Sequence, residues 1–170
     1  MNAKRITFPA CLSALSLALL YTACLLPTGR LSLIAAAGLI PAAAVISAGL
    51  PAGFLCYSVT GMIGLLILPW KGSATLYLIF FGLYPLVKSL VERIGQIWLE
   101  WLLKLLFFNL ILLVLLFAFK GVFFPLLTGL LAGRRWLIVL VGNALFPIYD
   151  ILLSGCIACY VIRVDRHLQR

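Results

Sequence analysis

Charged side chains are scarce in this chain of 170 residues, which carries 13 basic residues, 4 acidic residues and one histidine. Charged residues make up 10% of the sequence, whereas average globular proteins carry roughly a quarter. So few charges cannot cover the surface of a soluble domain of this length. The composition therefore excludes an ordinary soluble catalytic domain.

The shortage of carboxylates and histidine also argues against catalysis. Intramembrane proteases need a Ser–His pair, paired aspartates or a zinc motif, and prenyl- or phosphotransferases need clustered carboxylates with a metal ion. The acidic residues here are scattered along the chain, at Glu92, Glu100, Asp150 and Asp165. We therefore expect no catalytic residues, no enzyme activity and no cofactor in this chain.

Cysteine does not supply a metal site either. Cys156 and Cys159 have the spacing of a redox or metal motif, but no second cysteine pair accompanies them and His167 stands alone in a basic tail. Thiols within apolar helices behave as small hydrophobic side chains. The five cysteines are therefore predicted to pack rather than to bind metal.

Apolar residues are abundant instead, at 65% of the sequence, with a mean hydropathy of +1.24. The uncharged runs predict six membrane-spanning helices. The 40 residues between Arg30 and Lys71 far exceed the roughly 20 that cross a bilayer, and the turn residues Ala48–Gly53 divide that run into two. The predicted spans are residues 6–27, 31–49, 51–69, 73–93, 98–119 and 136–162.

The predicted fold class is an all-α membrane protein, a compact bundle of six transmembrane helices that forms a single integral membrane domain over residues 1–170. Residues 121–133 are too short to span a bilayer and are expected to form a loop or re-entrant segment. Residues 1–5 and the following apolar run resemble a signal peptide, but the run is longer than a signal core, so we expect a retained helix.

The distribution of basic residues predicts that both termini are cytoplasmic. An even number of spans places the termini on one side, and that side collects eight basic residues against five on the other, although the pair Arg134 and Arg135 argues the other way. The net charge of +9 is thus explained by membrane insertion and anionic lipid rather than by nucleic acid. The basic residues assigned to the cytoplasmic side are Lys4, Arg5, Lys88, Arg93, Lys104, Arg163, Arg166 and Arg170.

Asp150 is the strongest candidate for a functional residue, because it lies near the middle of the sixth predicted span, far from other charges. An ionisable side chain at membrane depth costs about 2.5–3.5 kcal/mol on insertion scales, so those present are candidates for function. Asn143, Pro147, Asp150 and Ser154 recur at helical spacing and share one face. We expect that face to point into the bundle.

Two lysines, Lys88 and Lys104, are candidate intramembrane charge partners of Asp150. Three interpretations remain open: structural ion pairs with local partners Lys88–Glu92 and Glu100–Lys104, binding of a solute or ion, and proton relay. The relay is disfavoured because the predicted spans hold no second carboxylate at a similar depth and no histidine.

Ala10, Ala14 and Ala18 form a stripe of small side chains on the first predicted span. Such a stripe allows the backbone of another helix to approach closely. The partner is either another helix of this chain or a separate protein.

Six helices in about 170 residues, both termini inside and this alanine stripe resemble the substrate-binding S-component of energy-coupling-factor (ECF) vitamin transporters. The resemblance implies that Ala10, Ala14 and Ala18 dock on a transmembrane T-component coupled to ATPase subunits, and that these partners use the ATP. It implies capture of a small solute, such as a vitamin, from outside a prokaryotic cell membrane. The candidate substrate-binding residues are then Asn143, Asp150, Tyr84 and Asn109. No motif diagnostic of a particular vitamin is present.

Two functions of other classes compete with this interpretation. One is a non-transporting membrane scaffold of the cell-envelope or cell-shape machinery, which predicts stable partners but no solute. The other is a small channel or antiporter, which requires a polar line through several spans, whereas only the sixth span shows one.

Overall fold

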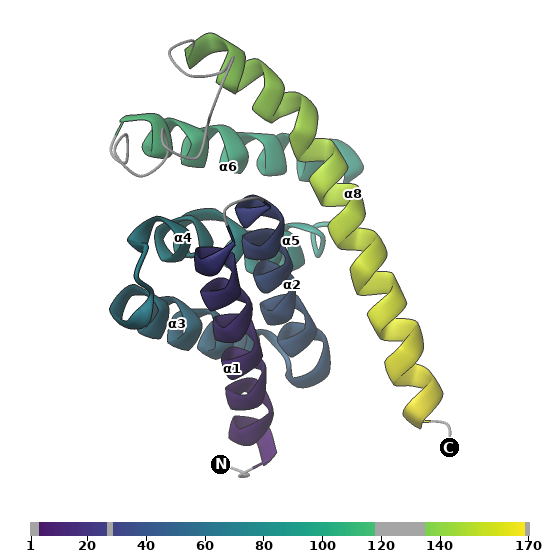
Figure 1. The fold of residues 1–170 in the computed structure, drawn as a ribbon. Helices are drawn as coiled ribbons and strands as arrows, with labels where there is room; N and C mark the ends of the chain where they lie inside the picture. Colours follow the sequence, from purple (N-terminus) through teal and green to yellow (C-terminus); the bar gives the residue numbers. More distant parts are fainter. Residues whose placement is uncertain (1–3, 27–28, 118–134, 169–170) are drawn as a thin grey trace. The chain divides into compact units, whose positions relative to one another are not determined.

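The computed structural model describes residues 4–26, 29–117 and 135–168, and these residues are mostly helical (Figure 1). Six helices in these ranges are long and apolar enough to cross a membrane, which confirms the predicted all-α chain with six such helices. The predicted loop or re-entrant segment 121–133 lies outside the described residues. The six helices are Thr7–Leu25, Arg30–Ala48, Leu50–Ile67, Lys71–Val91, Ile97–Phe117 and Trp136–Ile162.

The chain divides into two compact units, each of which is described by itself. The first unit comprises Met1–Ser89 and Gly155–Arg170, and the second comprises Leu90–Ser154. The long helix α8 (Arg135–Leu168) contributes its first part to the second unit and its last part to the first. The expectation of a single membrane domain stays a prediction.

The first unit is built on α1 (Lys4–Leu25), α2 (Arg30–Ala48) and α3 (Leu50–Ile67), which pack against one another (Figure 1). Gly49 joins α2 to α3 with φ of +87°, and its N–H donates to the Val45 carbonyl. Only glycine adopts such a backbone conformation readily, so this residue allows an abrupt reversal. The predicted division of the long apolar run at this point is confirmed.

One face of α1 forms the centre of this unit. Its buried residues recur every three or four positions, which places them on a single stripe. Ile40 and Ala44 of α2 and Cys56 of α3 form a buried cluster against which Leu12 and Leu19 of α1 pack. The buried stripe of α1 consists of Pro9, Ser13, Ser16, Leu20 and Ala23.

The fourth predicted span is not one regular α-helix. It consists of α4 (Lys71–Leu76), the π-helical segment η1 (Tyr77–Phe81) and α5 (Tyr84–Val91). Pro85 explains where α5 begins, since a proline inside a helix clashes with the carbonyl four residues earlier but fits the first turn. The wide turn closes with a bond from the Gly82 N–H to the Tyr77 carbonyl, 2.7 Å long.

The π segment packs closely on the three-helix core. A Cβ added to Gly38 of α2 would collide with the backbone carbonyl of Phe81, so only glycine permits this approach. The hydroxyl of Tyr57 donates to the Leu78 carbonyl at 2.8 Å. This bond satisfies a backbone acceptor in the irregular segment, where a lost bond would be costly in an apolar medium.

The second unit contains α6 (Ile97–Phe117) and the first part of α8. Leu112 and Leu116 of α6 form a buried cluster with Ile138 of α8. One turn before Leu112 on α6, the ring of Phe108 stacks on that of Phe146 of α8, with the ring centroids 4.6 Å apart. These apolar contacts fix the pairing of the two helices that carry most of the candidate polar residues.

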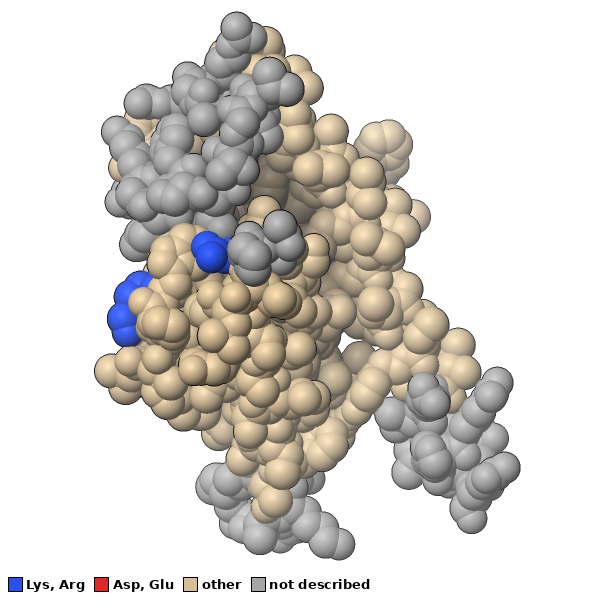
Figure 2. Space-filling model, in the orientation of Figure 1, with Lys and Arg blue, Asp and Glu red and all other residues tan. Residues whose placement is uncertain are grey.

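Several tryptophans and cations lie near helix ends, where membrane proteins carry them at the borders of the bilayer. Arg30 begins α2, and its guanidinium lies 5.0 Å from the ring centroid of Trp70, which precedes α4. Trp98 and Trp136 are exposed near the starts of α6 and α8. Figure 2 shows a face on which Lys and Arg appear only in small patches and the other described atoms are neither basic nor acidic.

Candidate functional site

Lys104 of α6 lies between two carboxylates within the second unit. Its Nζ donates to Oε1 of Glu92 at 2.8 Å and to Oδ2 of Asp150 on α8 at 3.2 Å. The side chains of Lys104 and Asp150 are 6% and 5% exposed, whereas that of Glu92 is 42% exposed. The structure therefore brings Asp150 to Lys104, a predicted partner, and buries that ion pair.

The helix faces explain why this pair forms. Lys104 belongs to the buried stripe of α6, which continues about two and three turns later with Ile111 and Leu115. Asp150 is buried on α8, with Phe146 before it and Leu153 after it on the same side. Burial strengthens the attraction between two opposite charges, but each charge also loses its hydration.

The sequence also suggested a local ion pair between Glu100 and Lys104. The structure pairs Lys104 differently. Its nitrogen instead contacts the more distant Glu92 and Asp150. The Trp101 ring lies 5.9 Å from the same nitrogen, within the range of a cation–π contact. The lysine is thus shared between two carboxylates from different parts of the unit.

Asn109 and Asn143 form a second polar contact between α6 and α8. Nδ2 of Asn109 donates to Oδ1 of Asn143 at 2.9 Å, and Nδ2 of Asn143 donates to Oδ1 of Asn109 at 3.0 Å. Each amide nitrogen also donates to the carbonyl one turn earlier in its own helix, that of Leu105 or Val139. Both NH₂ groups are thus fully used, so the pair presents only acceptor oxygens to any further molecule.

Tyr84 and Lys88 belong to the first unit and are described with it. Both side chains are buried, and the ring of Tyr84 stacks on that of Phe80 with centroids 5.7 Å apart. They lie on α5, one turn apart on the same face. The structure thus places three of the four predicted substrate-binding residues in one unit and the fourth, Tyr84, in the other.

The first unit also contains a buried group of hydroxyls, which the sequence did not single out. Oγ of Ser16 donates to the Ala37 carbonyl at 3.1 Å and lies 3.5 Å from the hydroxyl of Tyr77. Proline at position 41 has no N–H to offer that carbonyl in the usual helical bond, so Ser16 replaces the missing donor. Pro41 in the middle of an apolar helix was the available signal.

The predicted docking stripe lies on the opposite side of α1 from its buried face. Ala10, Ala14 and Ala18 are all exposed in the described structure. The residues of α1 that pack on α2 and α3 lie elsewhere around the helix, on the stripe that includes Ser13 and Ser16. The alanines are therefore not used for packing within the described part of the chain.

Among the described residues, no group of three or more His, Cys, Asp or Glu side chains lies close enough together to hold a metal ion. Cys156 and Cys159 are both exposed on α8. Comparisons with protein-family models, curated proteins and solved structures gave no match to this chain.

Proposed function

We propose that this chain is the substrate-binding membrane subunit of an ECF-type importer in a prokaryotic cell membrane. It would bind a small solute, such as a vitamin, from outside and dock through α1 on a T-component that is coupled to ATPases. The observation that carries this proposal is the exposure of Ala10, Ala14 and Ala18 on a helix whose opposite face is buried.

The alanine face suits a helical partner in a membrane. Between lipid-immersed helices the hydrophobic effect contributes little, so association depends on close packing of backbones over small side chains. Ala10, Ala14 and Ala18 recur every four residues and leave such a surface along about two turns of α1. A soluble partner would not need this kind of surface, whereas a transmembrane one would.

The energy for transport would come from the partners. The sequence contains no Gly-rich phosphate loop of the kind that cradles ATP. In the proposed complex this chain contributes solute capture and docking, and the ATPase subunits contribute hydrolysis. The chain itself is proposed to be neither an enzyme nor the binding site of a cofactor.

In the second unit, the proposed solute contacts are Asp150, Asn109 and Asn143, with Lys104 as charge partner. In the first unit, Tyr84 stays a candidate contact and Lys88 a candidate charge partner. In the described structure the Asp150 carboxylate is bonded to Lys104 and the two asparagines are bonded to each other. A solute that enters would have to exchange these contacts for its own. A ligand with both acceptor and donor groups could do so without leaving a buried charge or amide unsatisfied.

A membrane scaffold of the cell envelope is the second candidate, and the same contacts favour it. The Lys104–Asp150 pair and the reciprocal amide pair each join α6 to α8. Polar contacts of this type hold membrane helices together without any ligand. In this case the alanine face would bind cell-envelope proteins, and no solute would change the stability of the chain.

Copurification from native membranes, followed by mass spectrometry, tests the docking part of the proposal. We expect a T-component and ATPases to accompany the wild-type chain and to be lost from Ala14→Leu, because the added bulk separates the two backbones. Ala144→Leu is the matched control, since Ala144 is also exposed but lies on α8. Recovery of cell-wall enzymes instead would overturn the transporter proposal in favour of the scaffold.

Thermal unfolding with a panel of vitamins, metal ions and nucleobases tests the solute part. A bound solute at about 100 times its Kd should stabilise the chain by roughly 2.7 kcal/mol. Asp150→Asn should remove that stabilisation while the unliganded protein still folds. A general loss of folded protein, with no ligand effect in the wild type, would show that Asp150 only holds the helices together.

A further inference from the structure

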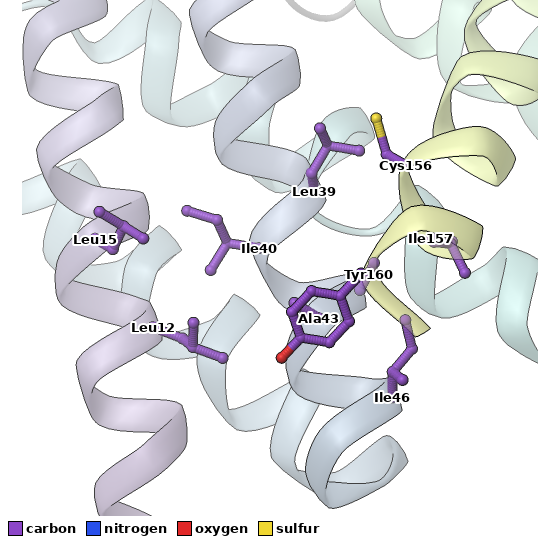
Figure 3. Close-up of a pocket in the computed structure, with 10 residues that line it drawn as sticks. Leu12, Leu15, Leu39, Ile40, Ala43, Ile46, Cys156, Ile157 and Tyr160 are labelled. Carbon is purple, nitrogen blue, oxygen red and sulfur yellow. The ribbon is translucent and has the colours of Figure 1, made fainter. Parts of the chain in front are cut away.

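A cavity of about 250 Å³ opens on the first unit between α1, α2 and the last part of α8 (Figure 3). Its lining is almost entirely hydrocarbon. Leu12 and Leu15 come from α1, and Cys156, Ile157 and Tyr160 come from α8. We call this cavity the α1–α2–α8 groove, and its lining residues from α2 are Leu39, Ile40, Ala42, Ala43 and Ile46.

The shape and lining of the groove exclude most occupants. A helix of another protein has a diameter of about 10–12 Å with its side chains, which is too wide for a cavity of about 250 Å³. A polar solute would lose its hydration and find few partners, since the lining offers one thiol and one hydroxyl. A thin, linear, apolar chain meets neither objection.

The hydroxyl in the lining marks the polar end of the groove. The Tyr160 hydroxyl lies 2.7 Å from Oγ of Ser47, in the last turn of α2. The lining residues from Leu39 to Ile46 extend about 10 Å along α2 toward that end. An apolar chain in the groove would therefore have its polar head beside Ser47 and Tyr160, where α2 ends at Ala48.

The charge of the nearby sequence indicates the sign of that head. Arg163 and Arg166 follow Tyr160 in the last turns of α8, and the sequence ends with a further arginine. Lys4 and Arg5 begin α1, the helix that contributes Leu12 and Leu15. Asp165 is the only acidic residue in these two terminal segments. Clusters of basic residues at a membrane surface attract anionic lipid heads.

We propose that the α1–α2–α8 groove binds one acyl chain of an anionic phospholipid, whose head lies at the basic end of the unit beside Ser47 and Tyr160. The site differs from the solute contacts and from the alanine face of the proposed function. The lipid site therefore does not depend on whether the chain transports a solute.

Two cysteines three residues apart provide the test. Both thiols are exposed, but Cys156 lines the groove and Cys159 lies outside its lining. Two variants, each retaining one of these thiols with the other four cysteines replaced by alanine, are labelled in detergent micelles with an apolar maleimide. Phosphatidylglycerol or phosphatidylcholine is then titrated in.

We expect phosphatidylglycerol to slow the labelling of Cys156 roughly tenfold at about 90% occupancy and to leave Cys159 unchanged. Phosphatidylcholine should have a much smaller effect on either thiol. Equal slowing of Cys156 by the two lipids would overturn the anionic assignment. No slowing, or equal slowing of both thiols, would overturn the groove as a lipid site.

Two further variants test the chain and the head separately. Phosphatidylglycerol should also stabilise the wild-type chain against thermal unfolding. Ala43→Trp fills the groove and should abolish that stabilisation, whereas Ala144→Trp, on the exposed side of α8, should retain it. Arg163→Gln combined with Arg166→Gln should leave the groove intact but equalise the two lipids. Retained lipid preference in Ala43→Trp or in the double arginine variant would contradict the proposal.

Discussion

Proline and serine compensate for each other at the contact between α1 and α2. Pro41 frees the carbonyl of Ala37, and Oγ of Ser16 donates to that carbonyl at 3.1 Å. In an apolar environment a backbone acceptor without a donor is costly. The serine therefore makes a proline tolerable within a buried helix, and the same serine lies next to the Tyr77 hydroxyl.

We predict that Ser16→Ala destabilises the chain by about 1–3 kcal/mol, because a buried carbonyl loses its donor. Pro41→Ala restores the N–H that bonds to Ala37 in a regular helix, so Ser16→Ala combined with Pro41→Ala should be more stable than Ser16→Ala alone. Thermal unfolding in detergent measures the change. Its readout is the reaction of the Cys56 thiol, which is buried in the folded protein, in a variant that keeps only that cysteine.

Ser32→Ala is the control, because Ser32 is exposed on the same helix as Pro41. It should change stability by less than about 0.5 kcal/mol. An additive effect of the two substitutions at Ser16 and Pro41 would show that the serine does not replace the missing N–H.

Charge at the residue scale illustrates what sequence can and cannot predict. The contact of Asp150 with Lys104 was predictable, because ionisable residues are few in the apolar helices and each one is conspicuous. The contact of Lys104 with Glu92 was not, because Glu92 lies twelve positions earlier, beyond the end of α5 and outside the helix that carries the lysine. Helical spacing predicts neighbours on one helix, and here it favoured Glu100 rather than Glu92.

For a single element, the fourth span likewise shows what the sequence can and cannot predict. The apolar run predicts a helix of sufficient length, which the structure confirms over Lys71–Val91. It does not predict the π-helical turn at Tyr77–Phe81, since the extra residue is accommodated by contacts with other helices. The carbonyl of Phe81 lies closely against Gly38 of α2, and this contact joins two segments that are far apart in sequence.

We predict that Gly38→Ala destabilises the first unit by about 1–3 kcal/mol, since its Cβ would collide with the Phe81 backbone, which has little freedom to move. Gly155→Ala is the matched control, because a Cβ at this position in α8 meets nothing within 4 Å. Removing a glycine from a helix interior should stabilise it by up to about 1 kcal/mol.

Thermal unfolding of the two glycine variants under identical detergent conditions is the measurement. Opposite signs are expected for the two changes in stability. If Gly38→Ala were as stable as Gly155→Ala, then α2 and the π segment would not pack as closely as the structure places them.

At the scale of the whole molecule, the sequence predicts which segments are helices better than it predicts how they are joined into units. Apolar runs bounded by charges, and Gly49 between two of them, carried enough information for six helices. The division into two units depends on contacts between distant segments, such as those of the last part of α8 with the first unit. Uniformly apolar helices carry little pattern that specifies those partners.

Topology gives the remaining prediction. Both termini should face the cytoplasm, because that orientation places eight basic residues inside and five outside. Gln96, between α5 and α6, should then be cytoplasmic, whereas Leu31, at the start of α2, should face the exterior. Both residues are exposed in the described structure, so a cysteine at either position is accessible to a reagent on the correct side.

Labelling with a membrane-impermeant maleimide measures the orientation in a background in which the five native cysteines are alanine. In intact cells, Leu31→Cys should react and Gln96→Cys should react only after lysis. The reverse pattern would place both termini outside. Reaction of both cysteines in intact cells would contradict the assignment of these loops to opposite sides of one membrane.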